Sequence, residues 1–198
     1  MSTEAPAPEN AASPAPGVPP ERESLLDKAL SERVLYPLLG LMMVLALVLF
    51  TLRRKDYGPA PELDLAVVRE TGELGADRVR LRDLRGKPVL LDFWATWCGP
   101  CRAETPILVR LDRRYRARGL NVVGVNVDET GPAVVPEFRR FFGIEYPIVY
   151  DLGAMASGRF GVQGLPTLVL IDRDGHVRYR HAGMASEEQL AEMIERVL

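Results

Sequence analysis

The fold of this chain is decided by one stretch, Asp92-Phe93-Trp94-Ala95-Thr96-Trp97-Cys98-Gly99-Pro100-Cys101. An apolar run over residues 88–94 predicts a buried strand, and helix-compatible sequence follows the Cys-x-x-Cys directly. The two cysteines are the only ones among 198 residues. Because the N-terminus of a helix stabilises a thiolate, a dithiol at a strand-to-helix junction indicates redox chemistry.

The order of the two cysteines predicts a division of roles. Cys98 lies at or just before the predicted helix start, whereas Cys101 lies one turn inside and is expected to be buried. We therefore expect Cys98 to be the nucleophile that forms a mixed disulfide, and Cys101 to be the thiol that resolves it. Between them, Gly99 and Pro100 pre-shape the turn, since proline is favoured at the first helical position.

A zinc half-site is the alternative for the cysteine pair, and it needs two further ligands. The chain has two histidines, at positions 176 and 181, on one predicted strand and without a cysteine partner. We therefore expect no metal and no cofactor, and we interpret both histidines as surface residues of a hairpin. The net charge of −2 gives no indication of a nucleic-acid partner.

The N-terminal part is predicted to attach the chain to a membrane. Residues 1–33 form a Pro/Ala-rich segment, expected to be disordered before a short helix. Residues 34–52 carry no charge and would span about 28 Å as a helix, so they predict one transmembrane anchor. A buried core helix and a cleaved signal peptide are the alternatives. A linker is expected over 53–61, and its basic Arg53-Arg54-Lys55 leans toward a cytoplasmic C-terminus.

Residues 62–198 predict an α/β domain with a mixed central sheet, helices on both faces and an N-terminal β-hairpin. The phenylalanines at 138, 141 and 142 are expected to share a core face of one helix, and Trp94 is expected in the core. Strands are predicted over 63–68, 78–81, 89–95, 120–127, 147–150, 167–171 and 176–181, and helices over about 98–118, from 132, over 155–160 and after 186.

The chain resembles a known superfamily, because its residues 93–101 look like the active site of thioredoxin. Residues 86–91, Arg102-Ala103-Glu104 and residues 124–128 resemble the membrane-anchored TlpA/ResA group. The segment 170–183 is similar to its cytochrome-c-maturation relative DsbE (CcmG). The resemblance covers residues 59–198 and implies a thioredoxin-like fold.

The resemblance also implies a loop that faces the dithiol. Pro166 matches the cis-proline of thioredoxin-like proteins, so the backbone of Leu165 would pair with an extended substrate, next to Thr167. An ordinary proline at a strand start is the alternative. Trp97 would form part of the substrate surface, unless it serves plain packing.

The resemblance further implies that two acidic residues act in proton transfer and tune the dithiol. Asp92 matches the buried aspartate of thioredoxin, and Glu104 matches the acid that tunes the dithiol in the TlpA/ResA group. Buried carboxylates have raised pKa values and serve as acid or base. A hydrogen-bonded strand residue is the alternative for Asp92, and an exposed helix residue is the alternative for Glu104.

Together these features predict a membrane-tethered thiol–disulfide oxidoreductase that reduces disulfides in extracytoplasmic partner proteins, such as apocytochrome c. We expect it in the bacterial inner membrane, with one span, a periplasmic catalytic domain and a membrane-embedded electron donor. The basic residues after the span conflict with this orientation. The alternatives are a dithiol binding module or copper metallochaperone without net redox turnover, and a peroxidase of the related peroxiredoxin class.

Overall fold

The computed structural model describes residues 36–47 and 57–198, and the chain divides into two units after Arg53. Residues 36–47 are helical. Across these two described ranges, no helix is both long and apolar enough to cross a membrane. The predicted tail, both ends of the predicted anchor at 34–52 and residues 53–56 of the predicted linker lie outside the described residues. The anchor therefore stays a prediction.

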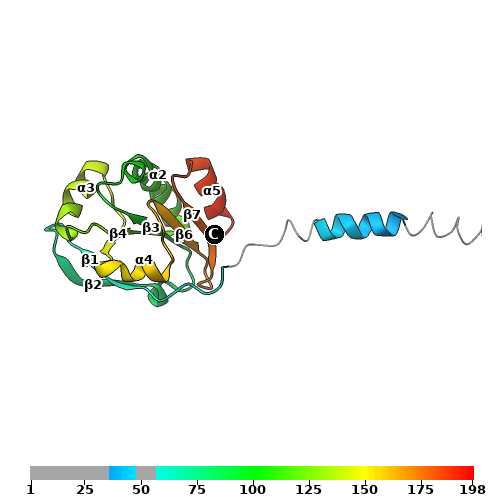
Figure 1. Ribbon diagram of the computed structural model, residues 1–198, viewed down its shortest axis with the longest axis horizontal. Coiled ribbons are helices and arrows are strands. Elements are labelled where there is room, and N and C mark those ends of the chain that lie inside the picture. Colours follow the sequence, from blue (N-terminus) through cyan, green and yellow to red (C-terminus); the bar gives the residue numbers. More distant parts are fainter. Residues whose placement is uncertain (1–35, 48–56) are drawn as a thin grey trace, which may run out of the picture. The chain divides into compact units, whose positions relative to one another are not determined.

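One mixed sheet forms the centre of residues 57–198, with seven strands in the order β2-β1-β5-β4-β3-β6-β7 (Figure 1). The strands β3, β4 and β5 are parallel neighbours, and the remaining pairs are antiparallel. This confirms the predicted mixed sheet. The strands are β1 (Asp64–Val68), β2 (Leu74–Arg80), β3 (Val89–Trp94), β4 (Asn121–Asn126), β5 (Ile148–Tyr150), β6 (Thr167–Ile171) and β7 (Val177–Ala182).

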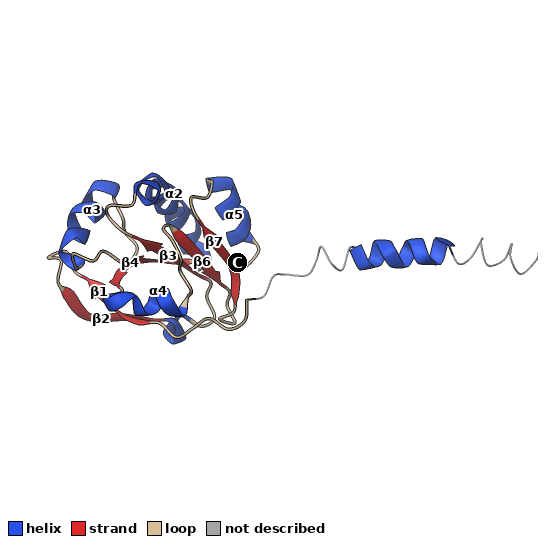
Figure 2. Cartoon of the chain, in the orientation of Figure 1, coloured by secondary structure: helices blue, strands red, loops and turns tan. Residues whose placement is uncertain are grey.

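Helices cover both faces of this sheet, as predicted. Figure 2 shows α2, α3 and α5 on one face and α4 on the other. The helices are α2 (Gly99–Tyr115), α3 (Val135–Phe142), α4 (Met155–Arg159) and α5 (Glu187–Glu195), with 3-10 turns at η1 (Leu81–Leu84), η2 (Arg116–Arg118), η3 (Pro132–Val134) and η4 (Leu152–Ala154). Helix α5 starts at the capping box of Ser186 and Gln189.

The N-terminal hairpin is longer than the sequence suggests. Strand β2 starts at Leu74, inside the stretch predicted as loop, because the chain turns tightly over residues 69–73. Gly72 takes a φ of +85° in that turn, which other residues rarely adopt. Leu74 then pairs with Val68 of β1. Pairing through the backbone is insensitive to side-chain type, and Gly75, Ala76 and Asp77 are of types that are rare in strands, so this part of β2 carried no strand signal.

The central strand β3 is buried along its whole length and separates two apolar layers. Leu91 and Phe93 face the layer of α4, whereas Leu90 and Trp94 face the layer of α2, α3 and α5. Since side chains alternate along a strand, Asp92 shares the face of Leu90 and Trp94. A carboxyl group therefore lies in the same layer as α2, directly before the dithiol.

The predicted phenylalanine face of α3 is only partly correct. Phe138 is buried and stacks on Trp94, with ring centroids 4.3 Å apart. Phe142 packs at the edge of the same core, but Phe141 is 74% exposed. This eight-residue helix presents too narrow a face to bury all three rings against the sheet.

Candidate active site

A disulfide joins Cys98 and Cys101 at the N-terminus of α2. Cys98 is the N-cap residue, and the backbone N–H of Cys101 donates a hydrogen bond to its Sγ at 3.2 Å. The unpaired N–H groups and the dipole of the helix stabilise a thiolate at this position. Cys101 is buried, as predicted, but Cys98 is also only 5% exposed. In the disulfide form the two cysteine residues thus differ less in exposure than the sequence suggests.

The residues beside the dithiol divide between surface and core. Trp97 is 68% exposed directly before Cys98, which excludes plain packing as its role. Trp94 is 2% exposed and belongs to the core, as predicted. Gly99 and Pro100 are exposed in the first turn of α2, so the loop between the cysteines faces solvent.

The Leu165–Pro166 peptide bond is cis, as the resemblance implied. Phe93 of β3 pairs with Thr167 of antiparallel β6, so the residues after β3 and those before β6 lie at the same end of the sheet. Pro166 is therefore beside the dithiol loop. Within the described part of the chain, neither the N–H nor the C=O of Leu165 makes a hydrogen bond, which leaves both for a ligand.

Asp92 is 3% exposed, and its Oδ1 has no hydrogen-bond partner among the described residues. The alternative of a fully hydrogen-bonded strand residue is therefore wrong. Burial raises the pKa of the Asp92 carboxyl well above its ordinary value, and the nearby Glu104 raises it further. The neutral acid is consequently favoured over the carboxylate.

Glu104 lies one turn after Cys101 on α2 and is 1% exposed, so the alternative of an exposed helix residue is wrong. The backbone N–H of Ala185 donates to its Oε1 at 2.8 Å, whereas Oε2 has no partner in the described chain. Burial raises the Glu104 pKa, and the hydrogen bond from Ala185 and the charge of His181 partly oppose that shift.

The loop from Gly183 to Ala185, after β7, touches several parts of the site. The N–H of Gly183 donates to the carbonyl of Pro166 at 2.8 Å. The Nε2 of His181 lies 3.4 Å from the carbonyl oxygen of Met184, and Ala185 binds Glu104 as described. The loop therefore connects the proline loop with the buried acid. We interpreted His181 as a surface residue, but it is half-buried and acts electrostatically on Glu104.

Asp128 is a site residue whose role the sequence reasoning missed. Its carboxylate accepts hydrogen bonds from the N–H and the Oγ1 of Thr96 at 2.8 and 2.7 Å, and from Nδ2 of Asn126 at 2.6 Å. The end of β4 thus holds the segment that leads into Trp97 and Cys98. An aspartate directly after an apolar strand was the available signal, since such a carboxylate needs donors nearby.

Arg102 links the dithiol loop to α3. Its guanidinium lies 5.5 Å from the ring centroids of Phe138 and Phe142 and 5.8 Å from that of Phe141. Its Nη1 also donates to the carbonyl of Thr96 at 3.4 Å. This cation–π cluster explains how the exposed Phe141 ring is accommodated beside the site.

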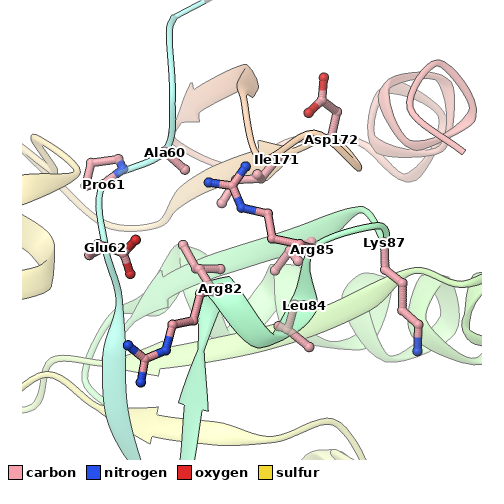
Figure 3. A pocket seen from close by; sticks show the side chains of 12 residues that line it. Ala60, Pro61, Glu62, Arg82, Leu84, Arg85, Lys87, Ile171 and Asp172 are labelled. Carbon is pink, nitrogen blue, oxygen red and sulfur yellow. The ribbon is translucent and has the colours of Figure 1, made fainter.

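A small recess lies at the start of β3, at the end of the sheet away from the dithiol. In Figure 3, Arg85 reaches toward Ala60 and Ile171, and Lys87 points away from this group. Arg85 donates to the backbone carbonyl of Asp174 across the recess. The enclosed space is only about 10 Å³, which is close to the room that one water molecule needs. This recess is too small for a substrate.

Comparison with protein families matches residues 59–196 to the Redoxin family. Among curated proteins, the thiol-disulfide oxidoreductase ResA of Bacillus thuringiensis (strain Al Hakam) is 32% identical over 168 residues, covering 83% of this chain and 96% of that protein. ResA of Geobacillus thermodenitrificans is 39% identical over 119 residues, covering 60% and 67% of the two chains.

Among solved structures, one assigned to the thiol:disulfide interchange protein DsbE from Chlorobium tepidum is similar to this chain. It is 32% identical with a TM-score of 0.65, and the match covers 73% of this chain and 99% of that one. The match thus spans nearly the whole of that chain.

Proposed function

Because the chain belongs to the Redoxin family, as a TlpA/ResA-like thiol–disulfide oxidoreductase, we propose that it reduces disulfides in partner proteins outside the cytoplasm. One observation carries this proposal. Cys98 caps α2 between the exposed Trp97 and the backbone of Leu165, which has no hydrogen-bond partner in the part of the chain that the structure describes. An extended client segment therefore has both a surface and hydrogen-bonding groups beside the nucleophile.

The proposed reaction starts from the reduced dithiol. The Cys98 thiolate attacks a client disulfide, a Cys98–client disulfide forms, and the second client sulfur leaves as a thiolate that takes a proton. Cys101 then loses its proton and attacks the Cys98 sulfur, which forms the Cys98–Cys101 disulfide and releases the client sulfur that was bound to Cys98 as a thiolate, which takes the second proton. The client gains two electrons and two protons, and this dithiol loses both.

The two buried acids are proposed to handle the proton of Cys101. An acid with a raised pKa is a stronger base once it is ionised. The carboxylate form of Glu104 or Asp92 therefore readily accepts the proton of the Cys101 thiol. The hydrogen bond from Ala185 to Glu104 keeps one oxygen fixed and leaves the other free for proton exchange. In this proposal both acids work in the resolving step.

The proposed setting is the bacterial inner membrane, with an anchor at 34–52 and the catalytic domain on the periplasmic side. The charge-free segment supports the anchor, and the need for a local reductant outside the cytoplasm supports the orientation. A reduced dithiol of a membrane-embedded donor would regenerate the enzyme, and apocytochrome c is a candidate client. Protease cleavage of the domain in intact spheroplasts is expected, and full protection would place it in the cytoplasm.

A Cys101→Ser variant tests the reductase proposal. Without the resolving thiol, the mixed disulfide at Cys98 should accumulate and identify the client by mass spectrometry, whereas the matched Cys98→Ser variant should trap none. Full activity of Cys101→Ser would instead favour a binding module without redox turnover. A reduction potential of the couple close to that of DsbA, about −120 mV, would exclude a reductant.

A further inference from the structure

An open pocket of about 580 Å³ lies beside the dithiol loop. This volume is within the range of pockets that bind small molecules, so it has room for side chains of a partner. Because Trp97 and Leu165 both line it, the pocket continues the surface on which a client disulfide must dock. We call it the acidic pocket and define it by Trp97, Asp128, Glu129, Asp151, Leu152 and Leu165.

The charged side chains of the acidic pocket all have one sign. Asp128, Glu129 and Asp151 line it, and no basic residue among the described ones does. The carboxylates of Asp128 and Asp151 are buried and already accept hydrogen bonds from the protein. Asp128 binds Thr96 and Asn126 as described above, and Asp151 accepts from the N–H groups of Ala156 and Ser157 at 2.8 and 2.7 Å. Glu129 is exposed at the rim. A basic partner group is therefore favoured there and an acidic one is repelled.

Large apolar side chains are exposed at the same pocket. Trp97 is 68% exposed and Leu152 is 70% exposed, and Met155, next to the lining residue Ala154, is 62% exposed. Exposed apolar groups that gather around a concavity indicate a binding surface. At its edge, the N–H and C=O of Leu165, which make no hydrogen bond within the described ranges, suit an extended backbone.

We propose that the acidic pocket binds an apolar side chain of the client segment that carries the disulfide, with a basic residue of the same segment at Glu129. This inference rests on the proposed reduction of partner proteins. In an extended segment, side chains two positions apart face the same side. The apolar side chain therefore lies two residues from the cysteine that Cys98 attacks, and the basic residue lies two positions further along, on the same side of the segment.

Four peptides test this selectivity on the full-length reduced protein. Each carries one cysteine in a disulfide with thionitrobenzoate, whose release is coloured. The residue two positions from the cysteine is Leu or Ser, and the residue four positions from it is Lys or Glu. We expect kcat/KM for the Leu/Lys peptide to exceed that for the Ser/Glu peptide at least about tenfold, which corresponds to about 1.4 kcal/mol.

Two pairs of variants locate the selectivity. Glu129→Lys should abolish or reverse the preference for Lys over Glu, whereas Asp77→Lys, at an exposed position of β2, should keep it. Leu152→Ser should reduce the preference for Leu over Ser, whereas Leu74→Ser, at another position of β2, should keep it. Preferences that survive both pocket variants would overturn the inference.

The outcomes separate this inference from the proposed function. Equal rates for all four peptides, with each reduced by the wild type, would refute the acidic pocket and leave the reductase proposal standing. If the wild-type protein reduces none of the peptides and no protein disulfide, such as those of insulin, the proposed function itself fails.

Discussion

Replacing Asp92 with asparagine should make the stability of the oxidised protein less sensitive to rising pH. Asp92 is buried, and its Oδ1 has no partner among the described residues. Its pKa is raised in the folded state, first by burial and then by Glu104. The folded state therefore holds this proton more tightly than the unfolded chain, whose aspartates titrate near about 3.9. The stabilisation that the Asp92 proton contributes to the folded state is fully present below that value, and it is lost as the pH rises through the pKa of the folded state.

The size of this effect follows from proton linkage. One group changes the unfolding free energy by at most about 1.4 kcal/mol per pH unit at 25 °C, between the unfolded and the folded pKa. This is measurable against a total of about 5–15 kcal/mol for a domain. In the Asp92→Asn variant the new amide is also buried without a partner among the described residues. This lowers the unfolding free energy by a constant amount of about 1–3 kcal/mol, which shifts the curve of stability against pH without changing its slope.

Urea unfolding between pH 4 and pH 9, followed by tryptophan fluorescence with the disulfide intact, measures this difference. The stability of Asp92→Asn relative to wild type should increase with pH and then level off. Asp77→Asn, at an exposed position, should remain parallel to wild type. In a Glu104→Gln background the effect should be smaller, because the Glu104 charge is one cause of the shift. Parallel curves for Asp92→Asn and wild type would refute the reasoning.

Three further changes probe the surroundings of the dithiol. Asp128→Ala should lower stability by about 2–3 kcal/mol in urea unfolding, since three donors lose their acceptor, and a loss below about 0.5 kcal/mol would contradict the role of this clamp. Phe138→Ala should lower the unfolding free energy by about 3–5 kcal/mol, whereas Phe141→Ala should change it by less than about 0.5 kcal/mol, because only Phe138 is buried. Thermal unfolding compares the two variants, and equal losses would contradict this difference in burial. His181→Gln should raise the Glu104 pKa and shift the pH profile of cysteine alkylation upward, and an unchanged profile would disprove the coupling.

The local sequence around the dithiol predicted most of the catalytic geometry. The strand before Cys98, the helix after it and the burial of Cys101 follow from apolar runs and helix capping, which act between near neighbours in the chain. The cis bond before Pro166 was predicted through the resemblance, because few X–Pro bonds are cis without such context.

Errors occurred where packing overrides local pattern. The start of β2 at Leu74 depends on pairing with Val68, and the exposure of Phe141 depends on how α3 meets the sheet. The roles of Asp128 and His181 were missed for the same reason. Asp128 binds Thr96, and His181 acts on Glu104 of α2. Both partners lie on other elements of the fold, so their spacing in the sequence carries no signal.

The sequence by itself determined the chemistry of this protein. The spacing of the two cysteines and the strand before them indicate a thiol–disulfide site, and the pattern of residues 62–198 indicates an α/β sheet, because capping and hydrophobic periodicity are local properties. Only the tertiary structure decided how that site is surrounded. It placed the Oδ1 of Asp92 and the Oε2 of Glu104 in the core without hydrogen-bond partners among the described residues, and it brought three acids and exposed apolar groups together beside Trp97. The physical reason is that desolvation and electrostatic fields depend on distances in space, which the folded sheet sets between residues far apart in the chain.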